Sequence, residues 1–128
     1  MIKILILGGG FGGIRTALDL NKKFRHRKDI QITLVDRNNY QIFYPSLYEV
    51  ATAYGITHDD PYNTVLRSTI SIPFSQIFAR TKIETIQAEI TQIDIENKKV
   101  STLGGRQLDF DYLVLAFGSE VSTYGIPG

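Results

Sequence analysis

A glycine-rich stretch near the start of the chain restricts the possible folds more than any other feature. The sequence LILGGGFGGI, residues 5–14, contains five of the eleven glycines, although every ordered glycine costs backbone entropy. Residues 2–7 before it are apolar apart from Lys3, which is typical of a strand covered on both faces. From residue 12 to about residue 24, apolar residues recur with the helical period. The pattern therefore predicts a strand, a glycine turn and a helix.

A second apolar run, IQITLVD, ends at Asp36 and completes a strand–helix–strand unit with parallel strands. In such a unit, the pattern Gly8-x-Gly10-x-x-Gly13 predicts a dinucleotide site. Gly8 permits a tight turn, Gly10 lets a pyrophosphate approach the backbone, and Gly13 lets the helix pack closely on the strand. The unpaired N–H groups at the helix start suit a phosphate. Asp36 is placed to accept hydrogen bonds from the adenosine ribose. Its negative charge would repel a 2′-phosphate, which disfavours NADP. The pattern does not choose between FAD and NAD.

The middle of the chain contains weaker signals. The aromatic-rich segment NNYQIFYPSLYEVATAYG predicts a short helix over residues 45–53. Residues 55–72 are mixed in character and are predicted to form a loop. The sequence IPFSQIFAR predicts another short helix that opens at Pro73.

The last third of the chain has the alternation of β-structure. Apolar residues alternate through Ile86, Ala88 and Ile90 and again at Ile93 and Ile95, which predicts strands with a small antiparallel β-meander. Turn residues occur at positions 96–97 and 104–105. Residues 113–116 predict one more buried parallel strand, which ends at a glycine. The predicted fold class is α/β, a Rossmann-like FAD/NAD(P)-binding fold with helices on a parallel sheet.

Composition excludes several other functions. The 128 residues fit one domain and include no cysteine, so disulfides, thiolate metal sites and thiol redox chemistry are absent from this chain. A net charge of +1 gives no indication of nucleic-acid or anionic-membrane binding. The run His58-Asp59-Asp60 is interpreted as a solvent-facing loop and not as a metal site. Ser46 and Ser119 have no histidine at a recognisable spacing, so a hydrolase triad has no support.

Three segments together carry a family resemblance: ILGGGFGGI, ITLVDRNNYQIFYPSLYEVATAYG and FDYLVLAFGSEVSTYGIPG. With them the chain resembles the type II NADH dehydrogenases, FAD enzymes of the pyridine nucleotide-disulfide oxidoreductase-like flavoprotein superfamily. The most specific piece is DRNNYQIFYPSLYEVA. The resemblance implies FAD as cofactor, and NADH and a quinone as substrates of the full-length enzyme. It also implies a cytoplasmic protein, peripheral to the inner face of the cell membrane.

The resemblance assigns roles to individual residues. Gly8, Gly10, Phe11, Gly12 and Gly13 would hold the pyrophosphate. Asp36 would hold the ribose, with Arg37 near the adenosine unless it is only a solvated surface residue. Pro45, Ser46 and Leu47 would lie near the isoalloxazine ring, although packing at a helix start would explain them equally. The backbone of Ile90 would meet adenine, and its side chain fits core packing in either case. Ala116 and Gly118 would line the pyrophosphate side, and Phe117 replaces a threonine that is usual in the superfamily.

The resemblance further implies that residues 1–128 are the N-terminal part of an incomplete FAD domain. Family members continue into an NAD-binding domain, return to complete the FAD domain and end in a membrane-associating part. The fragment alone is therefore expected to be inactive, to bind FAD weakly and to self-associate through uncovered strand edges. Two alternatives stay open. One is another FAD-dependent oxidoreductase of the sulfide:quinone or ferredoxin reductase type, and the other is a non-catalytic nucleotide-binding module.

Overall fold

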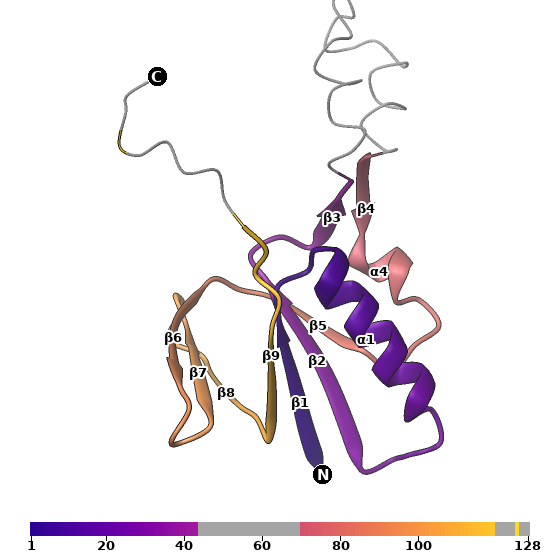
Figure 1. Ribbon diagram of the computed structural model, residues 1–128, viewed down its shortest axis with the longest axis horizontal. Coiled ribbons are helices and arrows are strands. Elements are labelled where there is room, and N and C mark those ends of the chain that lie inside the picture. Colours follow the sequence, from indigo (N-terminus) through magenta and orange to yellow (C-terminus); the bar gives the residue numbers. More distant parts are fainter. Residues whose placement is uncertain (44–69, 120–124, 126–128) are drawn as a thin grey trace, which may run out of the picture.

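A four-stranded parallel sheet forms the centre of the computed structural model, which describes residues 1–43, 70–119 and 125 (Figure 1). The strand order is β5-β2-β1-β9, and every neighbouring pair is parallel. The strands are β1 (Ile2–Leu7), β2 (Ile30–Asp36), β5 (Glu84–Gln87) and β9 (Tyr112–Leu115). The helix α1 (Phe11–Lys23) connects β1 to β2. The strand–helix–strand unit predicted from the glycine pattern is confirmed, with the helix beginning one residue earlier than expected.

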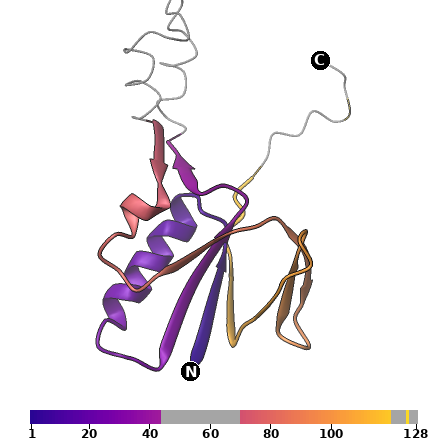
Figure 2. The ribbon, with the colours of Figure 1, turned by 180° about the vertical axis from the view of Figure 1, so that it is seen from behind.

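Apolar residues on both faces of the sheet build two separate cores. On one face, Ile6 and Leu34 pack with Ala17 of α1, and all three are fully buried. On the other face, Leu7 and Val35 pack against the antiparallel β-meander, and Figure 2 shows α1 and the meander on opposite sides of the sheet. Successive side chains of a strand point to opposite faces. An apolar run without alternation is therefore the pattern that a central strand between two cores requires.

The meander consists of β6 (Ile90–Asp94), β7 (Lys99–Thr102) and β8 (Gln107–Asp109), in that order. Its turns fall at the predicted positions. In the first turn, the backbone N–H of Asn97 donates to the Asp94 carboxylate at 2.9 Å. In the second turn, Gly105 adopts φ +76°. The alternation through Ile86 and Ile90 is divided between two sheets, because β5 pairs with β2 and only β6 belongs to the meander.

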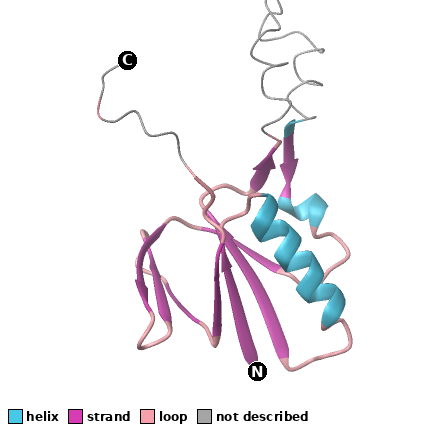
Figure 3. Cartoon of the chain, viewed as in Figure 1, coloured by secondary structure: helices cyan, strands magenta, loops and turns pink. Residues whose placement is uncertain are grey.

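A two-stranded antiparallel ribbon precedes the short helix (Figure 3). It pairs β3 (Tyr40–Ile42) with β4 (Ser71–Pro73), and α4 (Phe74–Ile77) follows directly. The helix predicted at Pro73 is confirmed, whereas the loop predicted over residues 55–72 is wrong for Ser71 and Ile72. These two residues gain backbone partners in β3, which the local sequence does not indicate. The helix predicted over residues 45–53 lies outside the described residues.

The strand β9 is parallel to β1 as predicted, but the expectation that it is buried is wrong. Leu115 is 60% exposed and Tyr112 is 64% exposed. Within the described residues, β9 has a sheet neighbour on one side only, and the core on the meander face reaches Leu113 but not Leu115. Neither α1 nor α4 has the length and apolar character needed to cross a bilayer.

Candidate functional site

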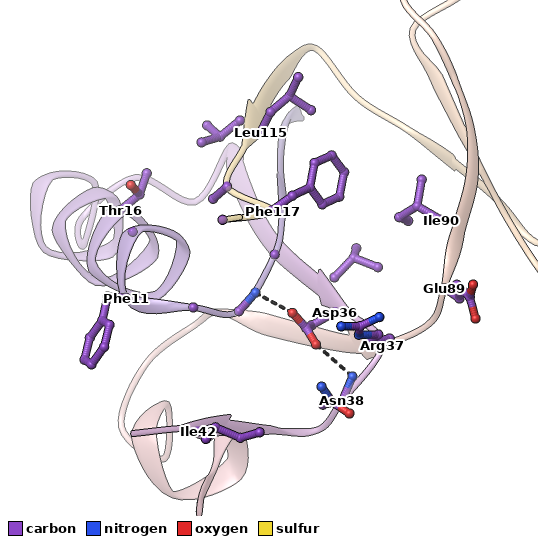
Figure 4. A pocket seen from close by; sticks show the side chains of 18 of the residues that line it. Phe11, Thr16, Asp36, Arg37, Asn38, Ile42, Glu89, Ile90, Leu115 and Phe117 are labelled. Carbon is purple, nitrogen blue, oxygen red and sulfur yellow. Dashed lines mark hydrogen bonds between the residues drawn. The ribbon is translucent and has the colours of Figure 1, made fainter. Parts of the chain in front are cut away.

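The carboxyl ends of the parallel strands surround a cleft of about 900 Å³. This is the edge at which open parallel sheets bind ligands. The cleft is bounded by the glycine turn after β1, the residues that end β2, the link between β5 and β6, and the segment after β9 (Figure 4). The lining residues are Gly8, Gly9, Gly10, Phe11, Gly12, Thr16, Val35, Asp36, Arg37, Asn38, Tyr40, Ile42, Ala88, Glu89, Ile90, Val114, Leu115, Ala116, Phe117, Gly118 and Ser119.

At three positions of the turn, the packing of neighbouring atoms leaves no room for a side chain. Gly8 has φ +108°, and a Cβ there would collide with the backbone carbonyl of Ala116. A Cβ on Gly13 would collide with the carbonyl oxygen of Gly8, and one on Gly9 with the ring of Phe74. All three glycines are buried. The close helix–strand approach predicted at Gly13 is therefore present, and Gly13 lies behind the cleft wall and not in it.

The other two glycines have no such constraint. Gly10 and Gly12 are exposed, and a Cβ on either would meet no atom of the described residues within 4 Å. Gly10 also has an ordinary backbone conformation, with φ −77°. No packing within the described residues explains why these positions lack side chains. Their open side faces the cleft, where a bound group could approach the backbone.

The start of α1 adds a favourable electrostatic environment. Gly10 is the N-cap residue, no side chain of the described residues caps the helix, and no acidic residue lies in its first turn. The first backbone N–H groups of the helix and the positive end of its dipole are therefore free to meet an anion in the cleft. The arrangement suits a phosphate group.

The carboxylate of Asp36 holds the glycine turn in place. Its Oδ2 accepts a hydrogen bond from the backbone N–H of Gly9 at 2.6 Å, and its Oδ1 accepts one from the N–H of Asn38 at 2.8 Å (Figure 4). The sequence placed Asp36 at this strand end but did not reveal these contacts. Each oxygen retains a lone pair that a ribose hydroxyl could use.

The cleft brings together most of the residues singled out from the sequence. Gly8, Gly10, Phe11, Gly12, Asp36, Arg37, Ile90, Ala116 and Gly118 all line it. Phe11 is 54% exposed, and its ring meets that of Phe43 edge-on at 5.8 Å between centroids. Ile90 also packs against the core on the meander face, so both interpretations of this residue fit. Pro45, Ser46 and Leu47 lie outside the described residues.

Sequence reasoning missed several polar and apolar wall residues. Thr16 lies one helical turn after Gly12, so helical spacing could have placed it at the cleft. Asn38 and Glu89 come from irregular segments that no periodicity marks. Over residues 1–43 and 70–119, His, Cys, Asp and Glu side chains form no group of three that could hold a metal ion. His58, Asp59 and Asp60 lie outside these ranges.

Comparisons with known proteins identify relatives of this chain. A type II NADH:quinone oxidoreductase of Staphylococcus aureus is 34% identical over 126 residues, which are 98% of this chain and 28% of that protein. The chain thus spans little more than a quarter of the length of the curated relatives it matches.

Solved structures share the same fold. The sulfide:quinone oxidoreductase of Aquifex aeolicus is 28% identical with a TM-score of 0.74, over 96% of this chain and 26% of that one. NDH2 of Plasmodium falciparum in complex with NADH has a TM-score of 0.74 at 23% identity, over 98% of this chain and 24% of that one. The family model for pyridine nucleotide-disulphide oxidoreductases matches residues 2–128. Because that match extends from β1 through the segment beyond β9, the chain belongs to the pyridine nucleotide-disulphide oxidoreductase family.

Proposed function

We propose that this chain is the N-terminal FAD-binding segment of a flavin-dependent NADH:quinone oxidoreductase. The observation that carries the proposal is the open space beside Gly10 and Gly12 at the uncapped start of α1. A pyrophosphate could approach the backbone there, with Asp36 beside the turn, where its carboxylate accepts a hydrogen bond from the Gly9 N–H at 2.6 Å. The 34% identity to a type II NADH:quinone oxidoreductase supports this substrate pair.

The residues of the cleft fit the parts of FAD. The backbone N–H groups at Gly10, Phe11 and Gly12 would bind the pyrophosphate, and Gly8 and Gly13 would shape the turn that presents them. Asp36 would bind the ribose, with Arg37 near the adenosine and the backbone of Ile90 near adenine. Ala116 and Gly118 would line the pyrophosphate side. Pro45, Ser46 and Leu47 are proposed to lie near the isoalloxazine.

When bound, FAD supplies the redox chemistry, because it can take a hydride equivalent from NADH and pass the electrons to a quinone. The protein contributes binding, orientation and exclusion of water. The chain contains no cysteine, so no dithiol of these residues takes part in the electron transfer. This separates the proposal from the disulfide reductases of the same family.

A second candidate is a sulfide:quinone oxidoreductase or another FAD-dependent oxidoreductase of the ferredoxin reductase type. The 28% identity and TM-score of 0.74 to the Aquifex aeolicus enzyme favour it. Both candidates need the same FAD site, so they differ in the electron donor and acceptor. A non-catalytic nucleotide-binding module would use the same cleft without any turnover.

The remaining partners are also proposals. NADH and the quinone would bind through parts of the full-length enzyme beyond these residues, as would the inner face of the cell membrane, with the protein on its cytoplasmic side. No nucleic acid is proposed as a partner. Leu115 and Phe117 are 60% and 58% exposed beside the edge of β9. These apolar groups would favour self-association of the 128-residue fragment.

The function is tested with the full-length protein. We expect it to purify with bound FAD and to oxidise NADH when a soluble quinone is added. Sulfide in place of NADH, with the quinone kept, and a ferredoxin in place of the quinone, with NADH kept, distinguish the second candidate. Turnover with sulfide but not NADH would replace the first proposal by the second. Bound nucleotide without any turnover would favour the non-catalytic module.

Removal of the Asp36 carboxylate should weaken both the turn and the cofactor site. In Asp36→Ala, the N–H groups of Gly9 and Asn38 lose their acceptor, so the free energy of unfolding should fall by about 1–3 kcal/mol. The free energy of FAD binding should fall by about 1–3 kcal/mol as well, because the ribose loses a partner. Urea unfolding and a flavin-release titration measure the two effects.

Asp36→Asn is the matched control for this prediction. It keeps one oxygen acceptor, so the variant should lose less in both measurements. Unchanged FAD retention in Asp36→Ala would rule out the ribose role, and unchanged stability would rule out the role in holding the turn.

A further inference from the structure

Gly9, the second glycine of the turn, is in contact with two different parts of the protein. On one side, its backbone N–H donates to Asp36 Oδ2 at 2.6 Å. On the other side lies the ring of Phe74, the first residue of α4, and the three atoms nearest to a Cβ built on Gly9 all belong to that ring. The peptide that links Gly9 to Gly10 leads directly into the start of α1. Its orientation therefore depends on how Gly9 is held.

The nearest obstacle to a side chain at Gly9 is the Phe74 ring. The backbone of Gly9 is not in the left-handed region, in contrast to Gly8 at φ +108°. An alanine at position 9 would therefore not meet the strain of a left-handed φ. At Gly8 no side-chain change could make room, because the obstructing atoms belong to the backbone of Ala116.

Phe74 is itself firmly anchored. Its side chain is 3% exposed, and its ring packs on that of Phe78 with 6.0 Å between centroids. Its backbone N–H donates to the carbonyl of Asn39 at 2.9 Å, in the turn between β2 and β3. The ring is therefore fixed relative to the end of β2, where Asp36 holds the other side of Gly9. A buried ring in a close-packed core transmits such a constraint because it has little room to move.

We propose that Phe74 is a positioning residue of the dinucleotide site. Through Gly9, its ring fixes the Gly9–Gly10 peptide and thereby aims the backbone N–H groups at the start of α1 into the cleft. The proposal rests on the proposed function, since it assumes that these N–H groups bind the pyrophosphate of FAD. It assigns to α4 a task that neither the glycine pattern nor the cleft lining reveals.

The test is a double-variant cycle in the full-length protein, with FAD as the probe. FAD affinity is measured by flavin fluorescence, and stability by the urea midpoint of the FAD-free protein. Gly9→Ala should weaken FAD binding about tenfold. Phe74→Leu should weaken it about threefold, because the turn loses one of its two supports. The pair Gly9→Ala/Phe74→Leu should bind FAD more tightly than Gly9→Ala alone, since the smaller side chain makes room for the new methyl group.

Phe78 provides the matched control. It lies in the same core at 6% exposure and belongs to the same ring pair. Phe78→Leu should lower the urea midpoint about as much as Phe74→Leu but leave FAD affinity unchanged, and it should not rescue Gly9→Ala. Equal effects of the two leucine variants on FAD affinity, or no rescue by Phe74→Leu, would overturn the proposal.

The cycle separates this proposal from the proposed function. A wild-type protein that binds no FAD would refute the proposed function, and the role of Phe74 in binding would fall with it. The urea midpoints would still show whether the ring holds Gly9, because rescue of stability does not need the cofactor. A wild-type protein that binds FAD without rescue in the double variant would refute only the role of Phe74.

Discussion

Replacement of Gly8 by alanine should lower the free energy of unfolding by about 2–6 kcal/mol, because backbone strain and overpacking each cost about 1–3 kcal/mol. The strain arises from φ +108°, and the overpacking from the carbonyl of Ala116, which occupies the position of the new methyl group. The backbone N–H of the same residue, Ala116, donates to the carbonyl oxygen of Leu7 in β1 at 2.8 Å. Relief of the collision would therefore separate β9 from β1. Urea unfolding of the full-length protein measures the loss.

Gly105→Ala is the control for strain without collision. Gly105 has φ +76°, but a Cβ there would meet no atom of the described part of the chain within 4 Å. The expected loss is about 1–2 kcal/mol, the cost of the left-handed conformation alone. If both variants lost the same free energy, the collision with Ala116 would contribute nothing, contrary to the packing described above.

Gly10→Val should have the opposite profile, with a large loss of FAD binding and little loss of stability. A Cβ at Gly10 would meet no atom of residues 1–43 and 70–119 within 4 Å. The free energy of unfolding should therefore change by about 1 kcal/mol or less, the usual effect of a poor N-cap residue. Within the cleft, the branched side chain would keep a pyrophosphate from the helix start. Loss of two hydrogen bonds to a charged group corresponds to roughly 3 kcal/mol, or about a hundredfold in affinity.

Two further variants serve as controls for this prediction. Gly10→Ala should lose less FAD affinity, because a methyl group obstructs less of the approach. Gly104→Val adds the same side chain at another open glycine, in the meander turn away from the cleft lining, and should leave FAD affinity unchanged. A folded Gly10→Val protein that still binds FAD tightly would show that the pyrophosphate does not approach Gly10.

The sequence predicted structure best where all the residues that determine an element lie in one short segment. The apolar run of β1, the glycine pattern and the end of β2 at Asp36 are local, so the strand–helix–strand unit followed from them. Except for Gly13, the described site residues on this unit and on the later strands line one cleft, because the sheet topology places the carboxyl ends of β1, β2 and β9 side by side. Their roles in binding FAD stay predictions.

What the sequence did not reveal depends on contacts between distant segments. Gly9 resembles any other glycine of the turn until the fold brings Phe74 against it. The carboxylate of Asp36 was expected to serve a ribose, and its two backbone donors appear only when β1 and β2 lie side by side. The apolar pattern of β9 predicts burial, but a pattern cannot show whether another element covers the strand. For this reason, the exposure of Leu115 could not be anticipated from the pattern.

The sheet order β5-β2-β1-β9 also has a consequence for synthesis of the chain on the ribosome. The strand made first lies between β2 and β9, and one wall of the glycine turn is supplied by Ala116. A nascent chain that has released only β1, α1 and β2 can form the crossover unit, but the Gly8 turn then has no backbone packed against it. The cleft therefore takes its final shape only after the segment that follows β9 has left the exit tunnel. We therefore expect capture of the proposed cofactor by the nascent protein to wait for that late step.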